Sequence, residues 1–535
     1  MTDANPKEVT VSAPGKILMA GGYLVLESPN IGLVVAADKR FFSTVKTLSA
    51  PSDVDKDDLV SFDEDQFSHK SIVDVHSPQY DTIFSYFVLY NNANDAIDNN
   101  DKTFLHIIPR SKSQSANPFI ERTLLLTFGY ILHSQKETSQ ILPDLLGIKL
   151  RADNDFYSQV PTIQKMNISG PPTPAHIESF PPFLPAGEHK TGMGSSAALV
   201  TSLVASLLAY FNNYQSSNDM DLAVVHNVAQ TAHSLAQGKI GSGFDVSAAV
   251  YGSQIYSRFS QSLIQPLLLA FSSSQNDHKL SLDFAQTLHS CIHQDWDTVQ
   301  KGFWLPKDME IIMADVCGGS ESPSMARKVL AWHKNYHQNK EFEKDDEGMG
   351  DMDDDDDYWE GLKNINTELY NLFTELHELL KDMEPTKQME LFQTLSMSKS
   401  DAWASSKSAL STQILNIREA FLESRSLLKA MGEAANVPIE PDEQTALADA
   451  TMDLEGVVAA GVPGAGGFDA LFCLYVKGKE TEKSDMVRDN VAKLWGNWKG
   501  GEDVSVNNDV SVISPMCVRA VGWGEGLQLQ TEMKW

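Results

Sequence analysis

Basic side chains are scarce in this 535-residue sequence. It has 42 lysines and arginines against 72 aspartates and glutamates, which gives a formal net charge of −30 at pH 7. General DNA- or RNA-binding surfaces need clustered lysine and arginine, so this deficit argues against one, and equally against adsorption to an anionic membrane. Part of the excess is local, because residues 343–357 contain ten acids and one lysine.

Cysteine and long apolar runs are also scarce. Four widely spaced cysteines with no CxxC pair argue against a disulfide framework or a zinc cluster, and fit a reducing compartment. The opening MTDANPKEVT has neither an apolar core nor an arginine-rich pattern, so we expect no signal or transit peptide. The longest apolar stretch, ALVTSLVASLLAYF, is shorter than the ~20 residues that span a bilayer. These absences predict a cytoplasmic protein without membrane insertion.

The length of the chain exceeds one ordinary core, since domains usually have ~100–200 residues. Hydrophobic residues make up 42% of it, which is ample for packed cores. The opening is β-rich, buried helices follow from about residue 196, helical periodicity dominates 359–431, and β patterning returns near the end. We therefore expect an α+β protein with two domains, 1–285 and 286–535, and a junction near 265–305.

Three segments carry local expectations. The stretch SAPGKILMAGGYLVLE, residues 12–27, predicts a strand, a glycine turn and a second strand, with Lys16 in a tight turn after Pro14 and Gly15. The prolines of residues 171–190 predict a loop without regular structure. The acidic run and its flanks, about 338–358, predict a disordered insertion. Its simplest interpretation is a solvated polyanion without a specific function.

The stretch KTGMGSSAALVTS, residues 190–202, places glycines directly before a helix. A helix start leaves N–H groups without partners and carries partial positive charge, so anions bind there. Gly192 and Gly194 supply bare backbone, and Lys190 adds a cation for a phosphate oxygen. Ser195 and Ser196 offer helix caps, and their hydroxyls are equally suited to a phosphate or a metal ion.

Two familiar nucleotide motifs fail at this loop. The Walker pattern fits Gly187 and Gly192 but needs lysine where Met193 stands. The dinucleotide pattern matches Gly192, Gly194 and Ala197, but a proline-rich loop precedes it instead of a strand. Taken alone, the loop is as compatible with a simple helix cap as with a phosphate site.

Other stretches repeat the combination of glycine and charge. Lys16 suits charge neutralisation on a transferring phosphoryl group, or it is an exposed lysine on a turn. Asp245 follows AQGKIGSGF and either orients a reacting group or caps a helix. A third glycine-rich turn spans residues 461–467, and Gly318-Gly319-Ser320 precedes another helix. Several such cradles would suit two phosphate-bearing substrates.

In this order and spacing, the stretches resemble the GHMP small-molecule kinases. The three carrying motifs are APGKILMAGGYLVLE, KTGMGSSAALVTS and GVPGAGGFDALFC, and Met193 replaces a more usual leucine in the second. The resemblance covers nearly all of the chain outside residues 50–125 and the acidic insertion. The resemblance is strongest to the members that act on 5-phosphomevalonate. Three further stretches carry this part of the resemblance: AQGKIGSGFDVSAAVYG, GGSESPSMARKVLAW and MGEAANVPIEPDEQTALADAT.

This resemblance implies an N-terminal domain like ribosomal protein S5 domain 2, a ferredoxin-like C-terminal domain and an active site between them. It implies that Lys16 and Asp245 are catalytic and that Ser196 contacts Mg²⁺. The residues expected around ATP are Lys190, Thr191, Gly192, Met193, Gly194, Ser195, Ser196 and Ala197. Those expected around the substrate are Tyr23, Ser320, Gly464 and Gly466. Mevalonate kinase-like members carry a metal-binding glutamate before the catalytic aspartate, whereas QTAHSLAQGK has no carboxylate.

The implied reaction moves the γ-phosphoryl group of ATP onto (R)-5-phosphomevalonate, an isoprenoid and sterol precursor, with no obligatory protein partner. Because the acceptor is already an ionised phosphate, we expect charge neutralisation and in-line positioning to outweigh base catalysis. Two alternatives stay open. One is a GHMP kinase for an alcohol such as mevalonate or a sugar, and the other is a catalytically silent ATP-binding regulator.

Overall fold

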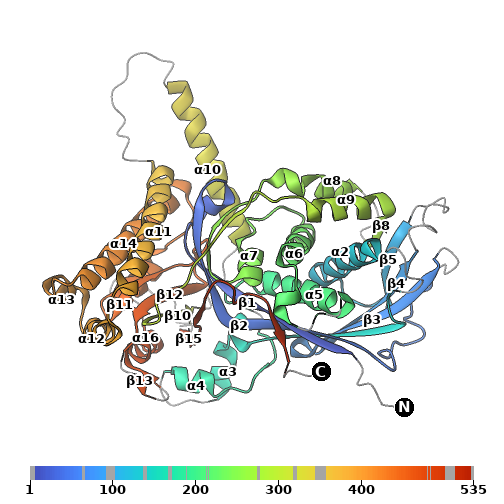
Figure 1. Cartoon of the computed structure of the whole chain (residues 1–535), viewed down its shortest axis with the longest axis horizontal. Helices are drawn as coiled ribbons and strands as arrows, with labels where there is room; N and C mark the ends of the chain where they lie inside the picture. The colour runs from blue at the N-terminus through green and yellow to red at the C-terminus, as the bar shows by residue number, and fades with distance from the viewer. Residues whose placement is uncertain are drawn as a thin grey trace.

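The computed structural model describes residues 7–531 apart from 63–66, 92–102, 136–140, 167–170, 188, 213, 215, 274–277, 317–321, 344–356, 479, 482–483 and 500–512. An eleven-stranded sheet with helices on it forms one half of the molecule, and a four-stranded sheet with helices on both faces forms the other (Figure 1). The expected α+β class is confirmed.

The large sheet is built mainly from the first 300 residues. Its main path runs β17-β1-β2-β6-β3-β4-β5-β8, and neighbours are antiparallel except for the parallel pair β3 and β6. The strands of this path are β1 (Glu8–Ala20), β2 (Ile31–Thr47), β3 (His69–Ser77), β4 (Thr82–Tyr90), β5 (Thr103–Pro109), β6 (Leu145–Ala152), β8 (Lys279–Ser281) and β17 (Gln528–Gln530). Off this path, β7 (Gln254–Ser257) pairs with β2 and with β9 (Val299–Gly302), and β16 (Ala520–Val521) pairs with β2.

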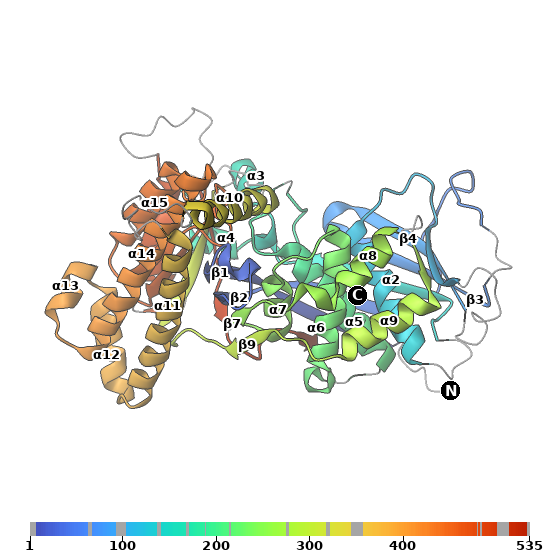
Figure 2. The ribbon, with the colours of Figure 1, turned by 90° about the horizontal axis from the view of Figure 1, so that it is seen from above.

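Helices cover one face of this sheet (Figure 2). They are α2 (Pro118–Ser134), α5 (Ser195–Asn212), α6 (Leu222–Gln237), α7 (Phe244–Tyr251), α8 (Gln265–Ser273) and α9 (Leu282–His293). The central helix α5 packs on β1 and β2 and contacts α2, α6 and α7. Among the described helices, α5 is long and apolar enough to cross a membrane, but 78% of that stretch is buried inside the protein. Its composition is therefore that of a core helix.

The small sheet has the strand order β11-β12-β10-β15. Its strands are β11 (Val457–Gly461), β12 (Ala470–Val476), β10 (Met309–Asp315) and β15 (Ser514–Met516). Side chains of β12 alternate between two cores: Phe472 and Leu474 join the main core with α14 (Ala409–Ala435), whereas Leu471 and Cys473 face α15 (Asp442–Met452) and α16 (Met486–Gly496). A strand buried on both faces explains the continuous apolar run ALFCLYV.

The remaining helices flank this half. They are α10 (Ser322–Glu343), α11 (Tyr358–Lys381), α12 (Pro385–Ser396) and α13 (Ser400–Ser405). Helix α11 packs along α14, and α10 projects from the body of the protein (Figure 1). The helical periodicity over 359–431 is thus confirmed.

The end of the chain connects the two sheets. Strand β15 pairs with β10 in the small sheet, and then β16 and β17 pair with β2 and β1 in the large one. The expectation of terminal strands is confirmed, but their return to the first sheet was not anticipated. The division at residues 285 and 286 stays a prediction.

Three local expectations need correction. Strand β1 continues through Pro14 and Gly15, with a register shift against β2 where a turn was expected. The proline-rich segment 171–190 contains α4 (Pro174–Glu178), because proline fits the first turn of a helix and Thr173 caps it. Helix α10 extends to Glu343 and α11 begins at Tyr358, so only residues 344–356 of the expected insertion lie outside the described residues.

Candidate active site

A pocket of about 460 Å³ lies where the three glycine motifs meet. Lys16 and Tyr23 come from the first motif, Gly192, Gly194, Ser195 and Ser196 from the second, and Gly464 and Gly466 from the third. Segments more than 400 residues apart in sequence therefore share one cavity. The turn between α6 and α7 and the start of α10 complete the lining.

The start of α5 forms one wall of the pocket. The Gly194 carbonyl accepts the first helical hydrogen bond, from the Ala198 N–H at 3.1 Å, so Gly194 occupies the N-cap position. Its φ of +77° lies in the left-handed region that glycine tolerates best, and a Cβ there would lie 3.2 Å from two carbons of the Lys16 side chain. The first turn of α5 therefore opens onto the pocket with bare backbone, which is the geometry of a phosphate cradle.

Lys16 is held against this loop at two points. Its N–H donates to the Met193 carbonyl at 3.0 Å, and its Nζ donates to the Gly192 carbonyl at 2.8 Å. Burial lowers the pKa of Lys16, and the carboxylate of Asp245 acts in the opposite direction. The ammonium group is thus held beside the start of α5 by the Gly192 carbonyl.

The third motif is attached to the first by main-chain contacts. The Gly464 N–H donates to the Leu18 carbonyl at 3.0 Å, and the Tyr23 hydroxyl donates to the Ala465 carbonyl at 2.5 Å. Tyr23 is 3% exposed, and burial raises the pKa of its phenol. Tyr23 lines the pocket, but its hydroxyl is occupied by this bond.

A hydroxyl, an imidazole and a carboxylate converge in the pocket at the start of α5. The His233 Nε2 lies 3.1 Å from Ser196 Oγ, 3.2 Å from Gln237 Nε2 and 4.0 Å from Asp245 Oδ2. The imidazole is only 3% exposed, whereas the side chain of Asp245 is 21% exposed. Burial lowers the pKa of His233, against a smaller opposing effect of Asp245. The ring is therefore neutral near pH 7, and Asp245 lies beside a neutral partner.

The pocket concentrates cations in an acidic protein. Its lining includes three lysines, at positions 16, 190 and 239, against two aspartates, at positions 245 and 469. Burial and, secondly, the nearby guanidinium of Arg327 lower the pKa of Lys239. A chain with a net charge of −30 has thus gathered positive charge here. That pattern suits polyanionic ligands.

The donor set at Ser196 fits a magnesium ion. Mg²⁺ takes oxygen ligands, usually one or two protein groups together with water and substrate phosphates. Ser196 Oγ and the Asp245 carboxylate both line the pocket and offer such oxygens. The described residues contain no cluster of three or more His, Cys, Asp or Glu side chains that could hold a metal ion by themselves. An ion at this site would accordingly depend on the nucleotide for further ligands.

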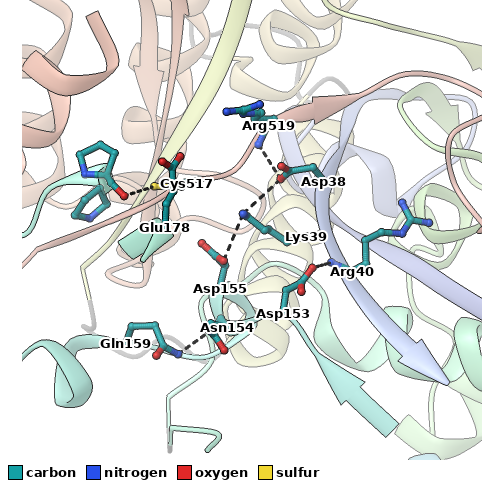
Figure 3. Close-up of polar contacts among 12 residues, drawn as sticks. Asp38, Lys39, Arg40, Asp153, Asn154, Asp155, Gln159, Glu178, Cys517 and Arg519 are labelled. Carbon is teal, nitrogen blue, oxygen red and sulfur yellow. Dashed lines mark hydrogen bonds and ion pairs between the residues drawn. The ribbon is translucent and has the colours of Figure 1, made fainter. Parts of the chain in front are cut away.

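Figure 3 shows a charged cluster in which Asp155 is buried and Asp38, Lys39 and Asp153 are half-buried. Lys39 Nζ lies 3.7 Å from an oxygen of Asp155 and 4.0 Å from an oxygen of Asp38. Asp153 Oδ2 accepts a hydrogen bond from the Arg40 N–H at 2.7 Å. Burial raises the pKa of all three carboxyl groups, that of Asp153 to about 6.

This cluster reaches both the loop and the end of the chain. The Asp155 carbonyl accepts the Thr191 hydroxyl at 2.6 Å, so the segment carrying the cluster supports the glycine loop. On the other side, the Arg519 N–H donates to Asp38 at 3.0 Å, in the segment that returns from β15 to β16.

The structure distributes the predicted ATP residues between two layers. Lys190, Gly192, Gly194, Ser195 and Ser196 line the pocket. The side chains of Thr191, Met193 and Ala197 are each 1% exposed and pack beneath it.

The predicted catalytic pair, Lys16 and Asp245, lines the pocket together with Tyr23, Gly464 and Gly466. Ser320 lies outside the described residues. Sequence reasoning missed five polar residues of the lining, namely His233, Gln237, Lys239, Ser242 and Asp469. The prediction for QTAHSLAQGK concerned a carboxylate only. The available clue was His233 on α6, whose imidazole faces Ser196, the predicted metal-binding serine.

The family model of the GHMP kinase N-terminal domain matches residues 165–253, which include the glycine loop and Asp245. The chain is 34% identical over 499 residues to "Phosphomevalonate kinase, peroxisomal" of Arabidopsis thaliana, covering 87% of this chain and 89% of that protein. It is 32% identical over 486 residues to a phosphomevalonate kinase of Aspergillus fumigatus, covering 88% and 87%.

Among solved structures, the Lin0012 protein of Listeria innocua superposes with a TM-score of 0.56. The match covers 98% of this chain and 100% of that one at 14% identity. At this identity the similarity concerns the fold alone.

Proposed function

Since this chain belongs to the phosphomevalonate kinase family of the GHMP kinases, we propose that its pocket carries the family's reaction on Lys16, Asp245 and the helix start at Ser195. The enzyme transfers the γ-phosphoryl group of ATP to (R)-5-phosphomevalonate and releases ADP and (R)-5-diphosphomevalonate. The observation that carries the assignment of residues is the convergence of three glycine motifs, a lysine and an aspartate on one cationic cavity.

In this proposal the start of α5 binds the triphosphate of ATP. The N–H groups of the first turn of α5 point into the pocket and bind phosphate oxygens, assisted by Lys190. Lys16, positioned by the Gly192 and Met193 carbonyls, donates from its Nζ to an oxygen of the group in transfer. Because the acceptor brings negative charge of its own, neutralising repulsion is the largest task of these residues.

Asp245 orients the partners of the reaction in this proposal. The acceptor phosphate is already ionised near neutral pH, so little is gained from removing a proton. The carboxylate lies near Lys16 and beside a neutral His233, which suits holding the ammonium in line. The third motif, with Gly464 and Gly466, closes the acceptor side of the cavity.

Mg²⁺ belongs to this proposal as a bound cofactor. A bound ion would supply positive charge that offsets the charge of the phosphate groups during transfer. Ser196 and Asp245 would hold it, since their oxygens are the donors it prefers. The cytoplasmic location stays a prediction, because the Arabidopsis relative is named as peroxisomal.

A steady-state assay of ADP release tests the function. With 5-phosphomevalonate, ATP and Mg²⁺ we expect turnover, and with mevalonate or a sugar we expect none above background. Omission of Mg²⁺ should abolish the rate. Turnover with an alcohol acceptor alone, or ATP binding without any transfer, would overturn the assignment in favour of one of the two alternatives stated above.

Two substitutions test the roles of the residues. Lys16→Met should lower kcat by ~10²–10³-fold or more, which is the usual cost of removing one preorganised charge-stabilising donor. Asp245→Asn should cost less, because it keeps an orienting oxygen. Lys363→Met, at an exposed lysine paired with Glu360 on α11, is the matched control and should leave kcat unchanged. Near-normal kcat in Lys16→Met with loss in Asp245→Asn would reverse the ranking.

A further inference from the structure

The orientation of His233 toward Ser196 and Asp245 has a consequence for the metal ion. We infer that His233 Nε2 is a third protein donor to the divalent ion, so that this site combines two oxygens with one nitrogen. The inference rests on the proposed function only in placing the ion at Ser196. It predicts that the affinity of this protein site for Co²⁺, relative to Mg²⁺, is higher than oxygen donors alone would give.

The spacing of the three donors supports this arrangement. Octahedral ligands at 2.0–2.1 Å from a small divalent ion lie ~3.0 Å apart when adjacent and ~4.2 Å apart when opposite. Ser196 Oγ and His233 Nε2 are 3.1 Å apart, which matches an adjacent pair. His233 Nε2 and Asp245 Oδ2 are 4.0 Å apart, close to the span of an opposite pair.

The tautomer of His233 is the one that a metal ligand needs. Its Nε2 lies 3.2 Å from Gln237 Nε2, and an amide nitrogen only donates hydrogen bonds. A lone pair on Nε2, on the side of the pocket, accepts from this amide and from the Ser196 hydroxyl, which also approaches it. Gln237 is exposed at the pocket wall, so its amide can give way to an ion without disturbing the core.

The rest of the ring is fixed by packing. His233 is buried on α6 and lies against Phe119, with ring centroids 5.7 Å apart. A ligand held in this way loses little conformational entropy when the ion binds. Carboxylate and water suit Mg²⁺, whereas imidazole suits transition metals, whose affinity rises from Mn²⁺ through Co²⁺. Replacement of a carboxylate by His233 therefore shifts preference away from Mg²⁺.

Electron spin echo envelope modulation of Mn²⁺ bound with the non-hydrolysable analogue AMPPNP tests the inference directly. We expect modulation from a directly coordinated ¹⁴N in the wild-type protein. Labelling the protein with ¹⁵N-histidine should replace it by a ¹⁵N pattern, which assigns the donor without any substitution. His233→Gln should abolish the coupling while Mn²⁺ still binds through nucleotide and Ser196.

A matched control lies on the same helix. His226 is also buried on α6, but it bonds Asn227 at 2.9 Å and is not part of the pocket lining. His226→Gln should keep the nitrogen coupling. In metal titrations monitored by nucleotide binding, the ratio of Co²⁺ to Mg²⁺ affinity should fall at least about tenfold in His233→Gln and His233→Glu, but not in His226→Gln.

Two results would overturn the inference. One is an absence of histidine nitrogen coupling in wild-type protein that has bound Mn²⁺ and AMPPNP, because His233 would then only orient the Ser196 hydroxyl. The other is coupling from ¹⁵N-labelled histidine that persists in His233→Gln, because the nucleotide analogue carries nitrogen of its own. Failure of the proposed function is recognised separately, as an absence of phosphoryl transfer to 5-phosphomevalonate with any metal ion.

Discussion

Asp153 makes the stability of this protein depend on pH in an unusual direction. Burial raises the pKa of its carboxyl from 3.8 to about 6. The hydrogen bond from the Arg40 N–H and the charge of Lys39 act in the opposite direction, but their effect is smaller than that of burial. The folded protein therefore binds this proton more tightly than the unfolded chain does. The contribution of Asp153 to stability is therefore greatest below pH ~4 and is lost as the pH rises from ~4 to ~6, where the carboxyl ionises.

The size of the effect follows from the two pKa values. Raising a pKa from 3.8 to about 6 corresponds to about 3 kcal/mol, since one pKa unit equals 1.36 kcal/mol. Asp153→Asn removes the titration and keeps an oxygen that accepts from the Arg40 N–H. The variant should equal the wild type near pH 4 and exceed its free energy of unfolding by up to about 3 kcal/mol at pH 7.

Urea unfolding followed by fluorescence at half-unit steps from pH 4 to pH 7 measures this difference. Glu455→Gln, at an exposed acid, is the control and should follow the wild-type curve. Parallel curves for Asp153→Asn and wild type across the whole range would refute the reasoning. So would a difference that grows toward low pH, since that is the sign expected of a carboxyl with a lowered pKa.

Three further substitutions test the contacts of the pocket. Tyr23→Phe should destabilise the protein by about 1–3 kcal/mol in thermal unfolding and raise KM for the acceptor, because it leaves the Ala465 carbonyl without its donor. Gly466→Ala should cost at least about 2 kcal/mol and most of the activity, since φ is +74° and the added Cβ would lie 2.1 Å from the Ile439 carbonyl oxygen. Lys239→Met should raise KM for a phosphorylated substrate about tenfold or more and weaken the dependence of KM on salt, which steady-state kinetics at two ionic strengths would measure.

The sequence predicted the parts of the site that depend on local chemistry. Glycines followed by serines and a small apolar run predicted a helix start at about residue 196, and α5 begins at Ser195. The apolar run DALFCLYV likewise predicted a strand, and β12 spans Ala470–Val476 with every residue buried. These features are set by residues that neighbour one another in the chain, so pattern and structure agree.

Features set by distant partners were not predictable in this way. Strand β1 continues past Pro14 because β2 bulges opposite Gly15, where Pro14 pairs with Arg40 but Lys16 pairs with Ala36. The return of β16 to the first sheet depends on an edge that only the folded β2 offers. His233 went unrecognised for the same reason, since its place beside Ser196 arises from the packing of α6 on α5.

The bulge in β2 also explains why the charged cluster around Lys39 lies where its strands support the glycine loop. Where β1 and β2 separate, Asp38 and Lys39 leave the ladder and meet Asp155 on one side and the returning C-terminal segment on the other. Asp155 in turn holds Thr191 of the glycine loop. Replacing such a cluster by apolar residues is often neutral for stability, so its charges are better explained by position than by energy. The loop is held by the Asp155 carbonyl and the C-terminal segment by the Asp38 carboxylate, so the strands that carry the cluster fix these two segments relative to each other. A pocket lined by both halves of the chain needs such a fixed relation.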